Sequence, residues 1–201
     1  MAIQIDRRGE LLARIVDELL SHGAADLSLR PLAERVGSSA RLLIYHFDSK
    51  EQLVAAALAE VREHIGASLR TRASEVQPKT LRNLILMVWE WATEAPNQRY
   101  FRLLFEVDGL AMFDRLSFSE EVRRANGAVW ITLIDKAANR LTQGGDLFTA
   151  HSTLILGSFI GLLQDFLSTG DLARTTNALC VLVDLISAGA PAPVHTEGCL
   201  S

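Results

Sequence analysis

The chain has 201 residues, of which 49% are hydrophobic and 22% charged, and its formal net charge is −4 at pH 7. This length suits one large or two small domains, and this composition excludes a disordered or fibrous chain. Because the balance of charge is acidic, any surface that binds nucleic acid must be local.

The first two predicted helices follow from apolar spacing and turn residues. Leucine, isoleucine and valine recur at helical spacing over residues 7–22, and Gly23 ends this helix. A short helix over about 29–36 follows, with Ser28 as its N-cap. Residues 97–190 contain no proline, so the chain lacks the turn signals of a β-rich fold.

Two further helices are predicted before residue 75. The third helix begins after Ser38 or Ser39, either of which can cap it, and runs for barely two turns through Phe47. Ser49 and the glutamine three residues later form a capping box that opens a long helix, which reaches about residue 73.

Beyond Pro78 the sequence becomes more apolar. Seven of the eight residues over 84–91 are apolar, which indicates a buried helix that Pro96 ends. Asn97 can cap the next helix, which is predicted over about 98–108.

Three more helices are predicted over about 117–141, 147–168 and 172–188, with Asp171 as the N-cap of the last. The tail over 190–201 has few apolar residues and is expected to be disordered. The sequence therefore predicts an all-α fold of about nine helices.

The second and third helices, with a turn containing Gly37 between them, predict a helix-turn-helix, whose second helix lies in the major groove of DNA. At about 100° per residue the third helix has two distinct faces. The apolar face, expected to pack on the first two helices, comprises Ala40, Leu43, Ile44 and Phe47. The opposite face comprises Arg41, Leu42, Tyr45 and His46.

The opposite face suits a DNA groove. Arg41 can donate two hydrogen bonds to guanine, Tyr45 can reach a phosphate or base edge, and Leu42 can pack on a thymine methyl group. Phosphate contacts are expected at helix starts, from Ser28, Ser39 and Lys50. The alternative is a surface helix whose tyrosine and leucine pack on a neighbouring protein segment.

Residues 27–53, LSLRPLAERVGSSARLLIYHFDSKEQL, resemble the N-terminal signature of the tetracycline-repressor (TetR) family of one-component bacterial regulators. The Tyr-His-Phe motif, followed by Lys50 and Leu53, is specific to that signature. The rest of the chain agrees with the family in the number and lengths of its predicted helices.

The resemblance implies a homodimer that binds a palindromic operator in double-stranded DNA and responds to a small-molecule effector, with repression as the usual action. Two departures are Ile44, where the family usually has an aromatic residue, and Arg41 with Leu42, where it usually has small residues. These departures change the expected operator sequence and not the class of activity.

The resemblance also implies how the chain divides. A three-helix helix-turn-helix DNA-binding domain is expected over 1–50 and a connecting helix over 51–74. An effector-binding and dimerisation domain is expected over 75–189, before the tail over 190–201.

Eight of the thirteen aromatic residues lie between positions 89 and 130. The resemblance implies an effector pocket among the later helices, and such pockets are mostly apolar with a few polar groups. Its expected lining comprises Trp89, Phe101, Phe105, Trp130 and His151, with Arg99 and Asn126 as further polar candidates. The alternative for each aromatic residue is packing in the core.

The last two predicted helices have few charged residues for their length. A four-helix interface between two copies explains this, because one protomer cannot easily cover both faces of each helix. The expected interface residues are Gly157, Gly161, Leu179, Leu182 and Ile186. The alternative is burial in the core of one protomer.

Other classes of protein find less support in the sequence. Its five histidines form no ligand cluster, and it has no phosphate-binding loop or nucleophile motif, so neither an enzyme nor a cofactor is expected. A helical ligand-binding or protein-interaction module without DNA binding is the remaining alternative. The two cysteines, the absence of a signal-peptide pattern and the short apolar runs predict a cytoplasmic protein with no membrane contact.

Overall fold

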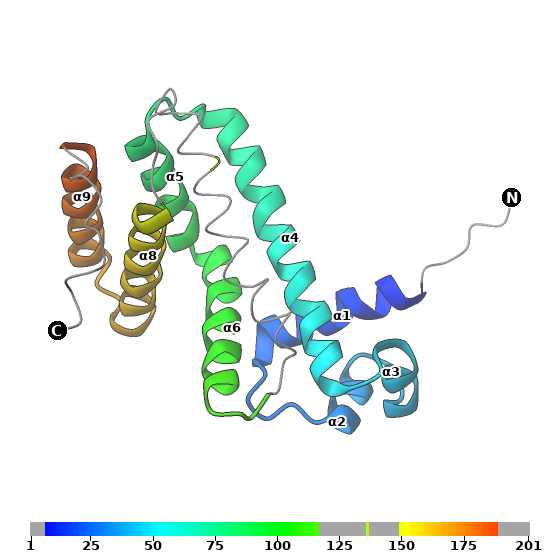
Figure 1. Ribbon diagram of the computed structural model, residues 1–201. Helices are drawn as coiled ribbons and strands as arrows, with labels where there is room; N and C mark the ends of the chain where they lie inside the picture. Colours follow the sequence, from blue (N-terminus) through cyan, green and yellow to red (C-terminus); the bar gives the residue numbers. More distant parts are fainter. Residues whose placement is uncertain (1–6, 117–135, 137–148, 189–201) are drawn as a thin grey trace, which may run out of the picture.

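The computed structural model describes residues 7–116, 136 and 149–188 (Figure 1). Within these ranges the chain forms α helices and no strand, as the sequence predicts. The helices are α1 (Arg7–His22), α2 (Leu29–Arg35), α3 (Ala40–Phe47), α4 (Lys50–Val76), α5 (Leu81–Thr93), α6 (Ala95–Met112), α8 (Thr149–Thr169) and α9 (Leu172–Ala188). The helix predicted over 117–141, apart from Lys136, and the tail lie outside the described residues.

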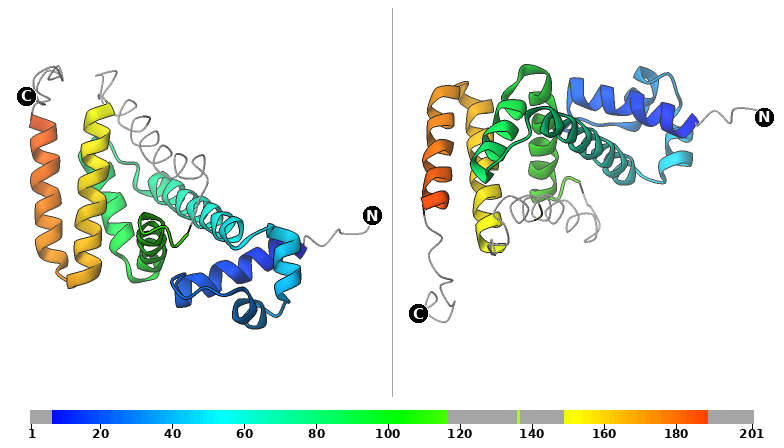
Figure 2. Two further views of the ribbon diagram at one scale, coloured as in Figure 1. Left: turned by 60° about the horizontal axis from the view of Figure 1, so that its bottom comes forward. Right: turned by 90° about the horizontal axis from the view of Figure 1, so that it is seen from above.

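One long helix joins two groups of helices. We call α1, α2 and α3 the head and α5, α6, α8 and α9 the body. α4 packs against α1 and α3 of the head and against α5 and α6 of the body. The pair α8 and α9 lies at the end of the molecule opposite the head (Figures 1 and 2). α6 also contacts α1, so the body touches the head directly.

Side-chain caps determine where several helices begin. Ser39 and Ser49 accept hydrogen bonds from backbone N–H groups three residues later, at 3.2 and 3.1 Å. Asp171 Oδ1 accepts from the N–H of Arg174 at 3.0 Å, at the start of α9. Each bond satisfies an N–H group that the first turn of a helix leaves without an acceptor, which confirms these three predicted caps.

The helix that follows α5 is longer than the sequence predicts. α6 begins at Ala95, so Pro96 lies in its first turn, where a residue without an N–H loses no helical hydrogen bond. Asn97, the predicted cap, lies inside α6 instead, and its Nδ2 donates to the carbonyl of Trp91 at 2.8 Å. α6 also continues past its predicted end at about residue 108, through Gly109, to Met112.

A continuous apolar core stabilises the short helices of the head. Its largest buried side chains are Ile15 and Leu19 from α1, Leu32 from α2, Leu43 from α3, and Leu53 and Leu58 from α4. Burial of one such side chain contributes about 1.5–3 kcal/mol relative to exposure. Because α2 and α3 have only 7 and 8 residues, they depend on this packing rather than on their own helix propensity.

By length and composition alone, one described helix could cross a membrane. It is α8, whose window Ser152–Thr169 has a mean hydropathy of 1.2. This window of 18 residues is longer than the short apolar runs from which the sequence predicted no membrane contact. A helix packed between two protomers meets the same criterion, because both environments exclude water.

Candidate nucleic-acid interface

A tight turn joins α2 to α3. Gly37 has a φ of +64°, in the left-handed region that favours glycine. Its N–H donates to the carbonyl of Glu34 at 3.2 Å, and the N–H of Ser38 donates to the carbonyl of Ala33 at 2.7 Å. These bonds close the end of α2, and Ser39 then caps α3, so the two helices form the predicted helix-turn-helix.

α3 packs on the head through one line of side chains. Leu43 and Phe47 are buried, and the helix contacts α2 and α4. Ile44, predicted to share this buried face, is 40% exposed, so that prediction is wrong. Because the helix rests on the line from Leu43 to Phe47, Ile44 lies at the edge of the contact, about 100° around the helix from Leu43.

The predicted DNA-binding face of α3 points away from the head. Tyr45 is 78% exposed, and Arg41 and Leu42 are also exposed. His46 is half-buried, and its ring meets those of Tyr45 and Phe47 edge-on, with centroids 5.1 and 6.4 Å apart. The structure thus brings Arg41, Leu42 and Tyr45 together on one accessible surface and places His46 at its margin.

Arg8 contacts the C-terminal end of α3, a role that the sequence does not predict. Its Nε donates to the carbonyl of His46 at 3.3 Å, and its guanidinium carbon lies 5.0 Å from the ring centroid of Phe47. Because these contacts join residues far apart in the chain, no local pattern marks Arg8 beyond its place at the start of the first helix.

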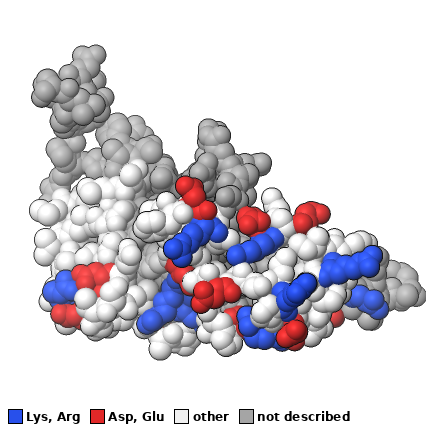
Figure 3. All heavy atoms as spheres, turned by 90° about the horizontal axis from the view of Figure 1, so that it is seen from below, with Lys and Arg blue, Asp and Glu red and all other residues white. Residues whose placement is uncertain are grey.

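The groups predicted to bind phosphate lie at three helix starts. Ser28 is the N-cap residue of α2, and its side chain makes no capping hydrogen bond. The Ser39 hydroxyl accepts the cap bond of α3 and can still donate its own hydrogen. Lys50 is the first residue of α4 and is half-buried. Figure 3 shows the basic side chains of this underside interspersed with acidic ones, so a few well-placed groups must provide the contacts.

The described residues predicted to line an effector pocket pack within the body. Trp89 is 2% exposed, its Nε1 donates to Thr176 Oγ1 at 2.8 Å, and its ring meets Phe159 edge-on at 5.5 Å. Phe101 and Phe105 are half-buried against the core, with ring centroids 6.5 Å apart. For Trp89, this arrangement is the core packing that the sequence left as the alternative.

The other predicted effector residues lie on the surface or outside the described part of the structure. Trp130 and Asn126 lie outside the described residues, and His151 lies in α8 with its side chain outside the description. Arg99 is exposed, and its guanidinium carbon lies 5.2 Å from the ring centroid of Tyr100.

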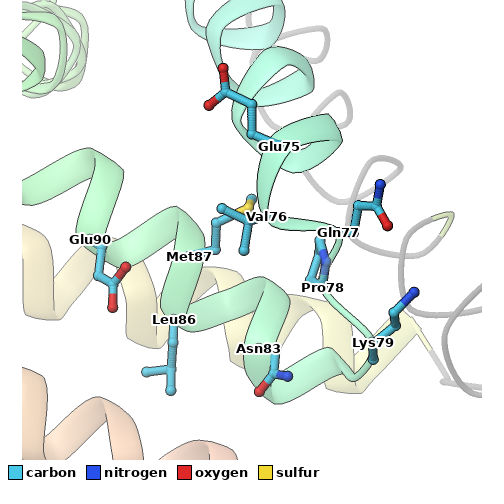
Figure 4. Close-up of a pocket in the computed structure, with 9 residues that line it drawn as sticks. All are labelled: Glu75, Val76, Gln77, Pro78, Lys79, Asn83, Leu86, Met87 and Glu90. Carbon is cyan, nitrogen blue, oxygen red and sulfur yellow. The ribbon is translucent and has the colours of Figure 1, made fainter.

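A groove of about 730 Å³ opens where α4 ends and α5 begins (Figure 4). Its lining comprises Glu75, Val76, Gln77, Pro78, Lys79, Asn83, Leu86, Met87 and Glu90. No predicted effector-binding residue belongs to this lining, and its carboxylates and amides differ from the mostly apolar pocket expected. Elsewhere in the part of the chain that the structure describes, no three His, Cys, Asp or Glu side chains are grouped as metal ligands.

α8 presents an apolar outer face with little steric bulk. Leu154 and Ile160 are exposed, and Gly157 and Gly161 are exposed on the same side of the helix. A Cβ at either glycine would meet no atom within 4 Å, so this face is open in the protomer.

On α9 the exposed apolar residues are not the predicted ones. Leu179 is 0% exposed, and Leu182 and Ile186 are half-buried against the core. Leu179 therefore cannot contact a second copy, which corrects its assignment to the interface. Val181 and Leu185 are exposed instead, Leu185 at 67%.

The N-terminal part of the chain matches a known family of regulators. Residues 11–57, from α1 into α4, match the family described as bacterial regulatory proteins, tetR family. No curated protein matches the chain in sequence.

Several solved structures share the fold. A protein from Rhodococcus sp. that is described as a TetR-family transcriptional regulator has a TM-score of 0.69 at 19% identity. The alignment covers 90% of this chain and 97% of that one. A transcriptional regulator from Rhodococcus sp. Rha1 has a TM-score of 0.69 at 21% identity, covering 93% and 100%. The multidrug binding protein EbrR, complexed with imidazole, has a TM-score of 0.66 at 20% identity, covering 94% and 93%.

Proposed function

We propose that this chain, whose residues 11–57 match the tetR family of bacterial regulatory proteins, is a cytoplasmic one-component repressor of that family that binds a palindromic operator. The exposed face of α3 is the observation that carries the proposal. Leu43 and Phe47 anchor the helix, while Arg41, Leu42 and Tyr45 project from it. A guanidinium, an apolar side chain and a phenol on one exposed helix match the donors and methyl groups of a major groove.

Each group on this surface is assigned a separate task. Arg41 donates to a guanine, Leu42 packs on a thymine methyl group, and Tyr45, with His46 at the margin, contacts a base edge or the backbone. The helix starts at Ser28, Ser39 and Lys50 bind phosphates and fix the register of the head on the duplex.

Two copies are proposed to pair through α8 and α9. A four-helix interface would cover the open glycine face of α8 together with Val181 and Leu185 of α9. The two-fold symmetry of such a dimer matches a palindrome whose half-sites lie about one helical turn apart, roughly 34–36 Å.

The body is proposed to bind a small-molecule effector. The likeness of the fold to a multidrug binding protein supports this assignment. Phe101 and Phe105 remain proposed contacts, as do Trp130 and His151, whereas Trp89 is assigned to the core. An effector that favours one dimer geometry would change operator affinity by its differential affinity, typically 1–3 kcal/mol.

Two substitutions separate base recognition from phosphate binding. Arg41→Ala is expected to cost about 1–3 kcal/mol and to relax the preference at one base pair per half-site. Lys50→Ala is expected to weaken all sequences alike and to reduce the salt dependence of binding. The measurement is selection of bound fragments from a random DNA pool, followed by titration at several salt concentrations.

Equal effects of the two substitutions on sequence preference would contradict these roles. If the unaltered protein selects no fragment at all, the chain is instead a ligand-binding or protein-interaction module without DNA binding.

A further inference from the structure

Glu106 of α6 binds the turn that follows α1. Its Oε2 accepts a hydrogen bond from the N–H of Ala24 at 2.7 Å, and its Oε1 accepts one from the N–H of Ala25 at 3.0 Å. Hydrogen bonds to a carboxylate are roughly twice as strong as neutral ones. Glu106 is half-buried and Ala24 is buried, so water competes poorly for the first bond.

Gly23 leaves the space that this carboxylate occupies. Its φ of +77° suits the glycine that ends a helix. In addition, a Cβ at this position would lie 2.5 Å from Oε2 and 2.8 Å from Oε1 of Glu106, closer than real Cβ atoms approach other atoms. The end of α1 explains why this residue has a positive φ. Only the position of Glu106 explains why it cannot carry a Cβ.

α6 contacts the chain on both sides of the helix-turn-helix. The turn bound by Glu106 leads through the buried Leu27 directly into α2. α6 also packs against α4, the helix that follows α3. The body thus holds both the segment that enters the α2–α3 pair and the helix that leaves it.

We propose that Glu106 is a positioning residue for DNA recognition, whose carboxylate sets the orientation of α2 and α3 on the body by fixing the turn after α1. The proposal rests on the proposed function and names the residue of the body through which the orientation of α3 is set. Operator affinity then depends on a side chain that lies outside the head and is not assigned a contact with DNA.

The charge of Glu106 makes the test specific. Glu106→Gln keeps the size of the side chain. However, one of the two backbone N–H groups would then face the NH2 group of the amide, which donates, instead of an oxygen that accepts. Because DNA is anionic, removal of a negative charge alone would strengthen binding. Loss of positioning is expected to weaken binding to the selected operator about tenfold, with an unchanged salt slope.

Asp114→Asn is the matched control. Asp114 is an exposed carboxylate just beyond the end of α6, and asparagine tolerates its φ of 54°. This variant removes the same charge and is expected to bind the operator as tightly as the unaltered protein or more tightly.

Hydrogen exchange at Ala24 and Ala25, measured without DNA, tests the contact independently. Faster exchange in Glu106→Gln, with slow exchange retained in the core of α4, is the expected result. Unchanged exchange, or faster exchange with undiminished operator binding, would overturn the proposal. If the unaltered protein binds no duplex, the proposed function fails and this role fails with it, while the exchange rates still report whether the contact forms.

Gly23→Ala supplies the partner for a double-substitution cycle. Alone, the added Cβ must displace the carboxylate and is expected to weaken operator binding about as much as Glu106→Ala does. Together, the two substitutions should weaken binding by clearly less than the product of their separate effects, because each removes the same contact. Multiplicative effects would show that Gly23 and Glu106 act separately and would contradict the proposal.

Discussion

Arg8 stabilises the end of the helix that is proposed to enter the major groove. Its Nε–H reaches the carbonyl of His46, one of the last carbonyls of α3, which have no helical donor. A positive charge near the C-terminus of a helix is favourable, and the Phe47 ring below the guanidinium adds a cation–π contact. Arg8 therefore supports the end of α3, and with it the orientation of the side chains that precede His46 on this helix.

Arg8→Gln is expected to lower the free energy of unfolding by about 1 kcal/mol, because it removes both contacts. Arg7→Gln removes the same charge from the adjacent exposed position and should leave stability within about 0.5 kcal/mol. Denaturant unfolding of the two variants measures the difference. Equal stabilities would mean that the contacts of Arg8 contribute nothing to the fold.

Helical periodicity predicted which side chains of α3 are exposed and failed at the margin. Arg41 and Tyr45 lie nearly opposite the buried Leu43, and Leu42 lies about 100° around the helix from it, on the side away from Ile44. Ile44 was misplaced because hydrophobicity indicates what is suited to burial, and an eight-residue helix has only one narrow line of contact. Glu106 had no sequence signal, because its partners are backbone groups 81 and 82 residues away.

At the turn between α8 and α9, one arginine binds two aspartates. Nη1 and Nη2 of Arg174 donate to the two carboxylate oxygens of Asp165, both at 2.8 Å. The Nε of Arg174 lies 3.4 Å from Asp171 Oδ2. Hydrogen bonding to the Arg174 guanidinium lowers the pKa of Asp165 below its usual value. The pair links the last turn of one helix to the first turn of the next.

Acid is expected to weaken this turn. Because the pKa of Asp165 is lower in the folded chain, the pair stabilises the fold above the ordinary aspartate pKa of about 3.9, and this contribution disappears as pH falls through the lowered value. The effect should be small, since exposed pairs are solvent-screened. Hydrogen exchange in the turn, expressed as protection factors that remove the intrinsic pH dependence of amide exchange, should lose more protection between about pH 6 and about pH 2 in the unaltered protein than in Asp165→Asn. An equal loss of protection would exclude the pair as its cause.

The bounds of helices were more predictable than the direction in which they face. Caps at Ser49 and Asp171 were recognisable because capping depends on a few adjacent residues. The inward side of α9 was not, because both sides of that helix are apolar in sequence. Only its packing on α8 and α5 distinguishes the buried Leu179 from the exposed Val181.

For the molecule as a whole, the open apolar face predicts that the chain does not remain a monomer. Gly161→Arg and Val181→Arg would each place an unpaired charge in the proposed interface, which costs several kcal/mol. Sedimentation at fixed protein concentration should then show monomers, or the variants should be insoluble. Ala173→Arg is the control and should remain dimeric, because this exposed position in the first turn of α9 lies about 80° around the helix from Val181.

An intact dimer in both the Gly161 and the Val181 variants would rule out this interface. Dimerisation of the unaltered protein in buffer without detergent would, in turn, assign the hydropathy of α8 to protein contact. Association only in the presence of lipid would assign it to a membrane.

The close approach of Glu106 to Gly23 also constrains how such a protein can diverge. Any side chain at position 23 excludes the carboxylate, whereas loss of the carboxylate leaves only the backbone requirement at position 23. The two positions should therefore covary asymmetrically among descendants of this chain. A glutamate at 106 that binds the turn after α1 should be accompanied by glycine at 23, while glycine at 23 can persist after the glutamate is lost. The order of substitution along a lineage is thus constrained, with position 106 free to change first.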